Sequence, residues 1–395
     1  MVLRQKFKGL VPRGIGGFDA ALRLLWRQHS RTEPHMASVQ PSFSARPERS
    51  AARAAPLALA RWLLVVAMMI VTIVTVGGIT RLTESGVSIT EWKPVSGILP
   101  PLNAAEWQDE FDKYRQTPQF VLVNGPAGMT LATYKVIFFW EWVHRLLART
   151  IGLAFALPLA WFWLRGQIPA GFKPRLLSLL ALGGLQGAVG WWMVQSGIVH
   201  DVRVSHFRLA AHLLVALTTL AGIIWTMLDL RAVSRGERAS RLTPFAALAL
   251  GVLVIQLFYG ALVAGLRAGT VAGGGWLDGN VWPLMQGQLF PAGIDWSQGA
   301  ARALLADPYL VHFIHRWWAW LVVIVLVIMG RRLRALRQRP TSIALHSAFG
   351  AQILIGIATV MSGVAIYLAV LHQLIGALLV AATAWSAHAL GRPQR

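Results

Sequence analysis

After a polar start, the chain alternates between long apolar stretches and short polar connections. Eight apolar segments follow residue 61, each close to the ~20 residues that cross a bilayer core, at 62–80, 135–164, 176–197, 206–228, 243–266, 309–330, 342–363 and 365–390. This pattern predicts an all-α integral membrane protein with eight transmembrane helices. Two connections, 81–134 and 267–308, are too long for simple turns. Within the first, NAAEWQDEFDKYRQ (103–116) predicts a short surface helix capped by Asn103.

Composition and charge agree with a membrane protein. Hydrophobic residues make up 55% of the 395 positions and charged residues only 13%, against about 25% charged in a soluble domain. The net charge of +21 lies mainly in the first 61 residues and in the connections 165–175, 229–242 and 331–341. The positive-inside rule places these connections and both termini on the cytoplasmic or matrix side, so we expect a lipid bilayer and no nucleic acid as partner. The chain has no cysteine, which excludes disulfides and thiolate metal sites.

Residues 1–61 read as a basic, disordered N-terminal extension, in which FDAALRLLW (18–26) predicts a short amphipathic helix. An Arg-rich, acid-poor start is also typical of a transit peptide. Residues 391–395 form a short C-terminal tail. We assign no function to either end.

The apolar region contains two copies of one pattern, 62–228 and 243–390, joined by an inner linker at 229–242. EWVHR in the second span corresponds to HFIHR in the sixth. Gln186, Gly190 and Ser196 in the third span recur at identical spacings as Gln352, Gly356 and Ser362 in the seventh. An even number of spans per copy gives both copies the same orientation. We therefore predict two parallel-repeat four-helix bundles, with 81–134 as the outer loop of the first and 267–308 as that of the second.

Four histidines occupy corresponding places in these copies: His144 and His212 in the first, His315 and His372 in the second. At ~1.5 Å per residue they lie ~10–14 Å below the outer surface. Each pair is carried by the second and fourth helices of its bundle, which are diagonal partners. A single histidine in a membrane helix is usually a hydrogen-bonded packing residue. Packing alone does not require histidine on both members of both pairs, so we predict that each pair holds a metal group.

Two imidazoles per bundle suit a haem, which needs only axial protein ligands, better than zinc, which needs additional ligands. Haem propionates require cations, and the candidates are Arg145, Arg316, Arg81 and Arg267. For Arg145 an ion pair with Glu141, four residues earlier on the same helix, is an equal alternative. The other histidines, at 29, 35, 200, 206, 346 and 388, are expected to be ordinary polar residues.

The copies differ three residues before the first ligand, where the first has Glu141 and the second has His312. A carboxyl group beside a ligand in a dry pocket can handle protons at a reacting group. The alternative is that Glu141 only neutralises Arg145. We expect Glu141 and its neighbours His144 and His212 to form the catalytic site, while the second copy holds a haem for electrons or architecture.

Several segments closely resemble the haem A synthase family: GGITRLTESGVSITEWKPVSGILPPL (77–102), EWVHRLLAR (141–149), GALVAGLRAG (260–269), NVWPLM (280–285), FIHRWWAW (313–320) and LHQLIGALLV (371–380). The resemblance covers 62–390. It implies oxidation of a methyl group of haem O to the formyl group of haem A, for terminal oxidase assembly. It also implies that His144 and His212 ligate the substrate haem, that Glu141 is the catalytic acid, and that His315 and His372 bind haem b.

Without cysteines the chain resembles the branch of the family found in mitochondria and related Gram-negative bacteria, so we expect a multi-pass protein of the bacterial inner membrane or the mitochondrial inner membrane. Its expected partners are haem O, handed over by haem O synthase, an unidentified electron donor and a second copy in a homo-oligomer. Two alternatives stay open. A bis-His dihaem electron-transfer protein explains four ligands but not the Glu141/His312 difference, and a parallel-repeat transporter predicts helices broken near the midplane.

Overall fold

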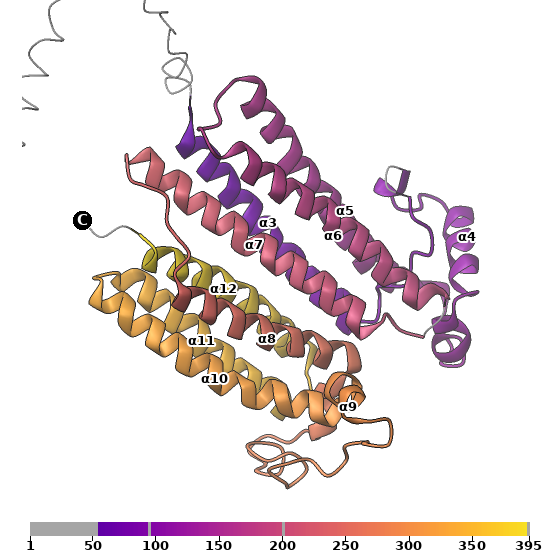
Figure 1. The fold of residues 1–395 in the computed structure, drawn as a ribbon. Helices are drawn as coiled ribbons and strands as arrows, with labels where there is room; N and C mark the ends of the chain where they lie inside the picture. Colours follow the sequence, from indigo (N-terminus) through magenta and orange to yellow (C-terminus); the bar gives the residue numbers. More distant parts are fainter. Residues whose placement is uncertain (1–53, 94–95, 200–201, 393–395) are drawn as a thin grey trace, which may run out of the picture. The chain divides into compact units, whose positions relative to one another are not determined.

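The computed structural model describes residues 54–93, 96–199 and 202–392 (Figure 1). The predicted helix at 18–26 lies outside these residues. Within them, the eight predicted spans are confirmed as helices long and apolar enough to cross a membrane, and the described residues contain no strand. The helices are α3 (Pro56–Leu82), α5 (Leu131–Leu164), α6 (Lys173–Val199), α7 (His206–Ser234), α8 (Pro244–Leu266), α10 (Pro308–Ala335), α11 (Arg339–Met361) and α12 (Ile366–Leu390).

Capping residues fix where several helices begin. The predicted surface helix is confirmed as α4 (Ala104–Tyr114), and the Asn103 side chain accepts a hydrogen bond from the Glu106 backbone N–H at 3.0 Å. Thr130 and Thr133 form a capping box at the start of α5, which satisfies backbone N–H groups that the helix leaves unpaired. Asp307 caps α10, where Pro308 follows as the first helical residue, a position that needs no N–H donor.

The sequence did not predict the short helical segments of the two long connections. They are η1 (Ser96–Ile98), η2 (Phe120–Asn124), η3 (Ala268–Ala272) and α9 (Ala300–Ala306). Segments of three to seven residues are too short to show a helical period, so their shape depends on the contacts around them.

The eight long helices form two groups of four (Figure 1). In the first, α3 and α6 each pack against α5 and α7, so that α5 and α7 are diagonal. In the second, α8 packs on α10, α10 on α11, and α11 on α12, and α12 closes the group by contacting α8. The histidine-bearing helices are therefore the second and fourth of each bundle.

The bundles share one hydrophobic core and a defined contact surface. The first helix of each bundle touches the fourth helix of the other, since α3 contacts α12 and α8 contacts α7, and the two fourth helices, α7 and α12, also contact each other. As a result, 61% of the apolar window of α7 is buried, against 6% for α6 and α11. α7 is the central helix, and α6 and α11 present their surfaces to the lipid.

Arginines at the outer ends of α3 and α8 hold the bundles together. Arg81 donates to the carbonyl oxygens of Ala264 and Gly265, at 2.7 and 3.0 Å, where α8 ends. Arg267, just after α8, forms an ion pair with Glu84, just after α3. Arg81 and Arg267, two of the four arginines predicted to bind propionates, thus each contact the opposite bundle.

A buried ionic cluster joins the same bundles at the other end of the helices. Asp229 on α7 is fully buried and binds His388 of α12 at 2.9 Å and Arg175 of α6 at 2.6 Å. The Ser240 backbone N–H also donates to this carboxylate, at 2.9 Å. His388 is thus a structural residue, as expected for the histidines outside the two pairs.

Candidate functional site

The first histidine pair lies on the two diagonal helices of the first bundle. His144 is on α5 and His212 on α7, and both helices pack against α3 and α6. Both side chains are partly exposed even though the helices around them are packed. The two predicted ligands are therefore carried by opposite helices of one bundle, and their pairing on a shared group stays a prediction.

The second pair repeats this arrangement. His315 lies on α10 and His372 on α12, two helices that contact each other, and both side chains are partly exposed. Among the described residues no three histidine, aspartate or glutamate side chains gather as a metal site. The donor set of each bundle is two imidazoles.

Glycines on the neighbouring helices let the imidazole rings lie against backbone. A Cβ atom added to Gly190, Gly260 or Gly356 would lie 2.8, 2.9 or 2.9 Å from the Cε1 atom of a histidine ring, and the rings concerned are those of His212, His315 and His372. At Gly77 the nearest atom is the Nε2 of His144, at 3.2 Å. A Cβ atom essentially never comes within 3.0 Å of another heavy atom, so a larger residue at any of the first three positions would force the imidazole to shift.

Glu141 is buried, with 2% of its surface exposed, and its carboxylate accepts four hydrogen bonds. Arg145 donates from Nη2 at 2.6 Å and from Nε at 3.1 Å to one oxygen. The Ser88 hydroxyl and the Ile89 backbone N–H donate to the other, at 2.7 and 2.8 Å. The ion pair that the sequence offered as one of two alternatives for Arg145 is present, and the carboxylate also anchors the outer connection to α5.

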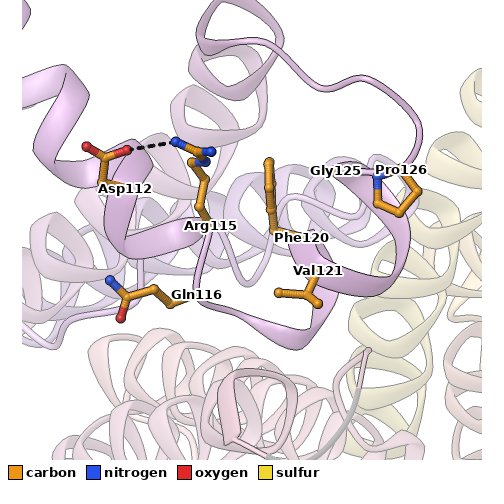
Figure 2. A pocket seen from close by; sticks show the side chains of 7 residues that line it. All are labelled: Asp112, Arg115, Gln116, Phe120, Val121, Gly125 and Pro126. Atoms are coloured by element: carbon orange, nitrogen blue, oxygen red, sulfur yellow. Dashed lines mark hydrogen bonds and ion pairs between the residues drawn. The ribbon is translucent and has the colours of Figure 1, made fainter.

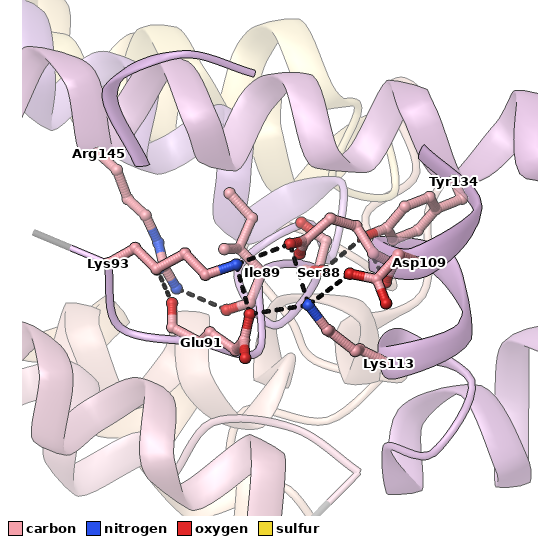
Figure 3. Close-up of polar contacts among 9 residues, drawn as sticks. Ser88, Ile89, Glu91, Lys93, Asp109, Lys113, Tyr134 and Arg145 are labelled. Atoms are coloured by element: carbon pink, nitrogen blue, oxygen red, sulfur yellow. Dashed lines mark hydrogen bonds and ion pairs between the residues drawn. The ribbon is translucent and has the colours of Figure 1, made fainter. Parts of the chain in front are cut away.

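Arg145 adds further hydrogen bonds between α5 and the outer connection. It donates to the carbonyl oxygens of Ile89 and Glu91 at 2.8 and 3.1 Å (Figure 3). Around it, Glu91 binds Lys93 at 2.5 Å and Lys113 of α4 at 3.0 Å. These hydrogen bonds lower the pKa of Glu91, and the Glu91 carboxylate raises the pKa of Lys93. The segment after α3 is thus fastened both to α5 and to α4.

Arg316 binds the outer connection of the second bundle, as Arg145 binds that of the first. Its Nη1 donates to the carbonyl oxygens of Val281, Pro283 and Leu284, the last at 2.7 Å. Its Nε and Nη2 are buried and have no partner among the described residues. His312, which replaces Glu141 here, is 2% exposed. Arg316 is therefore bound by the outer connection of its bundle and keeps two nitrogen atoms without hydrogen-bond partners among the described residues. Arg145, in contrast, is bound by both Glu141 and the outer connection of the first bundle.

These residues fit a group held between two imidazoles. Each bundle has two partly exposed imidazoles on its second and fourth helices. In the second bundle the buried Nε and Nη2 atoms of Arg316 also lack hydrogen-bond partners in the described part of the chain, and buried polar atoms are rarely left unpaired. Two imidazoles per bundle suit the axial ligands of a haem, and the free donors of Arg316 suit a propionate.

A shallow pocket elsewhere in the outer connection does not involve the histidines (Figure 2). It lies between the end of α4 and η2 and is lined by Asp112, Arg115, Gln116, Phe120, Val121, Gly125 and Pro126. Its ion pair, Arg115 to Asp112 at 3.4 Å, is exposed on both sides. Such pairs contribute little, and we assign it no role.

Residues that contact the site without being ligands were not predicted from the sequence. Ser88 and Ile89 lie within the segment 77–102 that carries the family resemblance, but their contact with Glu141 depends on how the connection folds back on α5. Gln256, whose Nε2 atom lies 3.1 Å from Nδ1 of His315, could have been found from the sequence. It stands four residues before Gly260, as Gln186 stands before Gly190 and Gln352 before Gly356.

Comparison with known proteins agrees with this arrangement. The model of the family described as "Cytochrome oxidase assembly protein" matches residues 60–384. Heme A synthase of Novosphingobium aromaticivorans is 72% identical over 349 residues, 88% of this chain and 99% of that protein. Heme A synthase of Erythrobacter litoralis is 56% identical over 86% of this chain and 99% of that protein, and that of Rhodospirillum centenum is 45% identical over 91% and 95%.

The similarity therefore spans the whole membrane region. With eight apolar helices and bacterial relatives of nearly the same extent, the chain is a multi-pass protein of the bacterial inner membrane. It belongs to the cytochrome oxidase assembly family and, within that family, to the haem A synthases.

Proposed function

We propose that this haem A synthase oxidises a methyl group of haem O to the formyl group of haem A in its first bundle. His144 and His212 hold the substrate by its iron, and Glu141 handles protons. The observation that carries this proposal is the position of Glu141, three residues before His144 and so on the same face of α5. The second bundle has His312 in that place.

The residues that donate hydrogen bonds to Glu141 determine how it takes part in the reaction. Arg145, Ser88 and Ile89 hold the carboxylate in one orientation through their hydrogen bonds. Taking up a proton requires some of these bonds to break, which loosens the outer connection above the substrate. We therefore assign Glu141 two linked tasks, proton transfer and closure of the pocket.

In the second bundle, His315 and His372 would hold haem b. A haem supplies one-electron chemistry when bound. The residues of this chain bind and orient it: the two imidazoles from facing helices, and Arg316, whose unpartnered Nε and Nη2 in the described part of the chain suit a propionate carboxylate. For Arg81 and Arg267, we retain the prediction of propionate binding only as a second use, because both already join the bundles.

The expected partners follow from the chemistry. Haem O is apolar and enters from the membrane, so we propose direct hand-over from haem O synthase. Converting a methyl group into a formyl group replaces hydrogen by oxygen, so the reaction needs a source of that oxygen atom as well as a separate electron acceptor or donor. The exposed faces of α6 and α11 leave room for a second copy in a homo-oligomer.

Pyridine haemochrome analysis of the purified protein tests this function. Haem A, or a haem intermediate between O and A, together with haem b is the expected result. Haem b alone would instead indicate an electron carrier. Absence of haem from protein made in haem-sufficient cells would reject the proposal.

A further inference from the structure

The connection between α8 and α10 contains a long uncharged segment. Residues 279–294 include no acidic or basic side chain, and Asp278 and Asp295 stand on either side of them. About a quarter of the residues of a soluble domain are charged, so a run of this kind is unusual for a segment surrounded by water. The segment is also too irregular and too short to cross the membrane.

A two-residue turn folds this segment back on itself. The Met285 N–H donates to the carbonyl oxygen of Gln288 at 2.8 Å, and the Gln288 N–H donates to that of Met285 at 3.2 Å. Between them, Gln286 and Gly287 both have positive φ angles, 54° and 76°, as a type I′ turn requires. The residues before and after the turn therefore run in opposite directions and form two arms.

The arm before the turn is bound inside the protein. Val281 and Met285 are buried. The carbonyl oxygens of Val281, Pro283 and Leu284 accept the hydrogen bonds from Arg316 described above. This arm is therefore fixed to the outer part of α10.

The arm after the turn is apolar and exposed. Leu289 and Phe290 expose 61% and 52% of their surface. The same arm is attached farther along, because Ile294 is buried and the Asp295 N–H donates at 3.0 Å to Asp307, the cap of α10. Two exposed apolar side chains are thus presented by a segment that is held at both ends.

Phe290 joins this arm to the lipid-facing surface of α10. Its ring meets that of Phe313 edge to face, with 5.0 Å between the centroids, and Phe313 contacts Trp317 at 6.1 Å. From there exposed apolar side chains continue along the helix at helical spacing: Trp317, Trp320, Leu321, Ile324 and Ile328. In a membrane-spanning helix such a stripe faces the lipid tails. The exposed surface of the arm is therefore continuous with a surface that lipid covers.

The length of α10 gives the depth of this contact. The basic residues within 331–334 mark the inner end of the span. Counted back from Gly330, the ~20 residues that cross a bilayer core end near Val311. Phe313 therefore lies close to the boundary between hydrocarbon and headgroups, and Phe290 lies at the same level. Irregular backbone does not occur in the hydrocarbon core itself, whereas headgroups and their water can satisfy its polar groups.

We propose that Leu289 and Phe290 bind the headgroup region of the adjacent lipid leaflet and anchor the connection between α8 and α10 to the membrane surface. Leucine and phenylalanine are typical of segments that lie in this region. Because the other arm of the same turn holds Arg316, the bilayer supports the carbonyl oxygens that bind this arginine. The anchor goes beyond the reaction proposed above and does not depend on it.

The absence of cysteine from the chain allows a fluorophore to be placed at one chosen position. Leu289→Cys is labelled with nitrobenzoxadiazole, and the full-length protein is reconstituted into phosphatidylcholine vesicles. Part of the lipid carries a nitroxide, either next to the headgroup or near the end of the acyl chain. The label at position 289 should lose more fluorescence with the nitroxide next to the headgroup than with the deep one, and little with iodide in the water.

Two variants calibrate the depth. Ile324→Cys, in the lipid-facing stripe of α10, should be quenched more strongly by the deep nitroxide. Gln108→Cys, exposed on the charged helix α4, should be quenched by iodide and by neither lipid. If Leu289→Cys is poorly produced, Gln288→Cys at the exposed turn is measured with the same expectation as position 289.

Two results would overturn the proposal. Quenching at position 289 by iodide and by neither lipid means that the side chain faces water. Protection from iodide and from both lipids means that a protein, such as a second copy of this chain, covers the surface instead. None of these measurements depends on haem turnover, so their failure is distinguishable from failure of the proposed function.

Discussion

The hydroxyl of Ser88 donates to the carboxylate of Glu141 at 2.7 Å, and both residues are buried. Ser88 belongs to the connection that leaves α3, and Glu141 lies one turn from His144 on α5. The residue proposed to handle protons is thus also the point at which the outer connection attaches to the helix carrying a substrate ligand. Chemistry at Glu141 and the position of that connection are therefore coupled.

Glu141→Gln should retain haem but lose formyl production. The amide still accepts a hydrogen bond from Ser88 or Ile89, but it cannot take up a proton and it loses the ion pair with Arg145. Extracted haem should therefore be haem O and haem b, as measured by pyridine haemochrome. Glu106→Gln, on the exposed start of α4, is the control and should leave haem A unchanged. Undiminished haem A in Glu141→Gln would remove this residue from the mechanism.

Gly356→Ala should impair haem retention in the second bundle. The added Cβ would lie 2.9 Å from Cε1 of His372, and overpacking of this kind costs about 1–3 kcal/mol. Haem per protein should fall and the melting temperature should decrease. Gly350→Ala on the same helix, α11, has nothing within 4 Å of the added atom and should behave like the unchanged protein. Equal haem content in the two variants would contradict the observed ring position.

His372→Ala should lower haem b while leaving a haem in the first bundle. One imidazole of the pair is lost, and His315 alone holds the iron less tightly. The matched control is His346→Ala, because His346 binds the backbone carbonyl of Ser342 at 2.7 Å and lies outside both pairs. Haem-to-protein ratios measure the difference. Full haem b content in His372→Ala would reject the second pair as ligands.

The segment around Glu91 should loosen in acid. Lys93 and Lys113 lower the pKa of Glu91, so their contribution is complete above the ordinary carboxyl range and is lost as the pH falls through the lowered pKa, below roughly pH 4. The effect is small because the pairs are partly exposed, at most about 1 kcal/mol. Amide hydrogen exchange of residues 83–93, expressed relative to the intrinsic exchange rate at each pH, should therefore accelerate at acid pH.

Glu91→Gln provides the comparison. Its exchange should already be faster at neutral pH, and the acid-dependent increase should largely disappear. An equally steep acid response in Glu91→Gln would assign the effect to other carboxylates.

The sequence predicts the membrane helices well, for physical reasons, and the assignment of the four histidines as ligands stays a prediction. Apolar runs of ~20 residues have few alternatives to a membrane helix, and internal repetition supports each ligand position twice. Helix ends were less accurate: α7 runs to Ser234, past the predicted 228, because its last turns are buried and Asp229 binds the inner linker at Ser240. The assignment of both termini to the cytoplasmic side stays a prediction.

Contacts made by irregular segments could not be predicted. Arg145 and Arg316 were assigned to propionates from their positions beside ligands, yet both bind carbonyl oxygens of the outer connections. No periodic pattern reveals where such a connection folds back. Gln256 was predictable in principle, since its spacing to Gly260 repeats that of two other glutamines, but its histidine lies on the next span rather than within a recognisable motif.

The contact surface between the bundles has an implication for how this chain arose. The first helix of each bundle contacts the fourth helix of the other bundle, and the two fourth helices contact each other. This is the self-complementary pattern of a twofold-symmetric dimer, in which a patch on one subunit binds the same patch on its copy. A half-length ancestor with four helices would have formed this surface with an identical partner. Fusion of two such genes then freed each half to diverge, so that one acquired glutamate where the other has histidine.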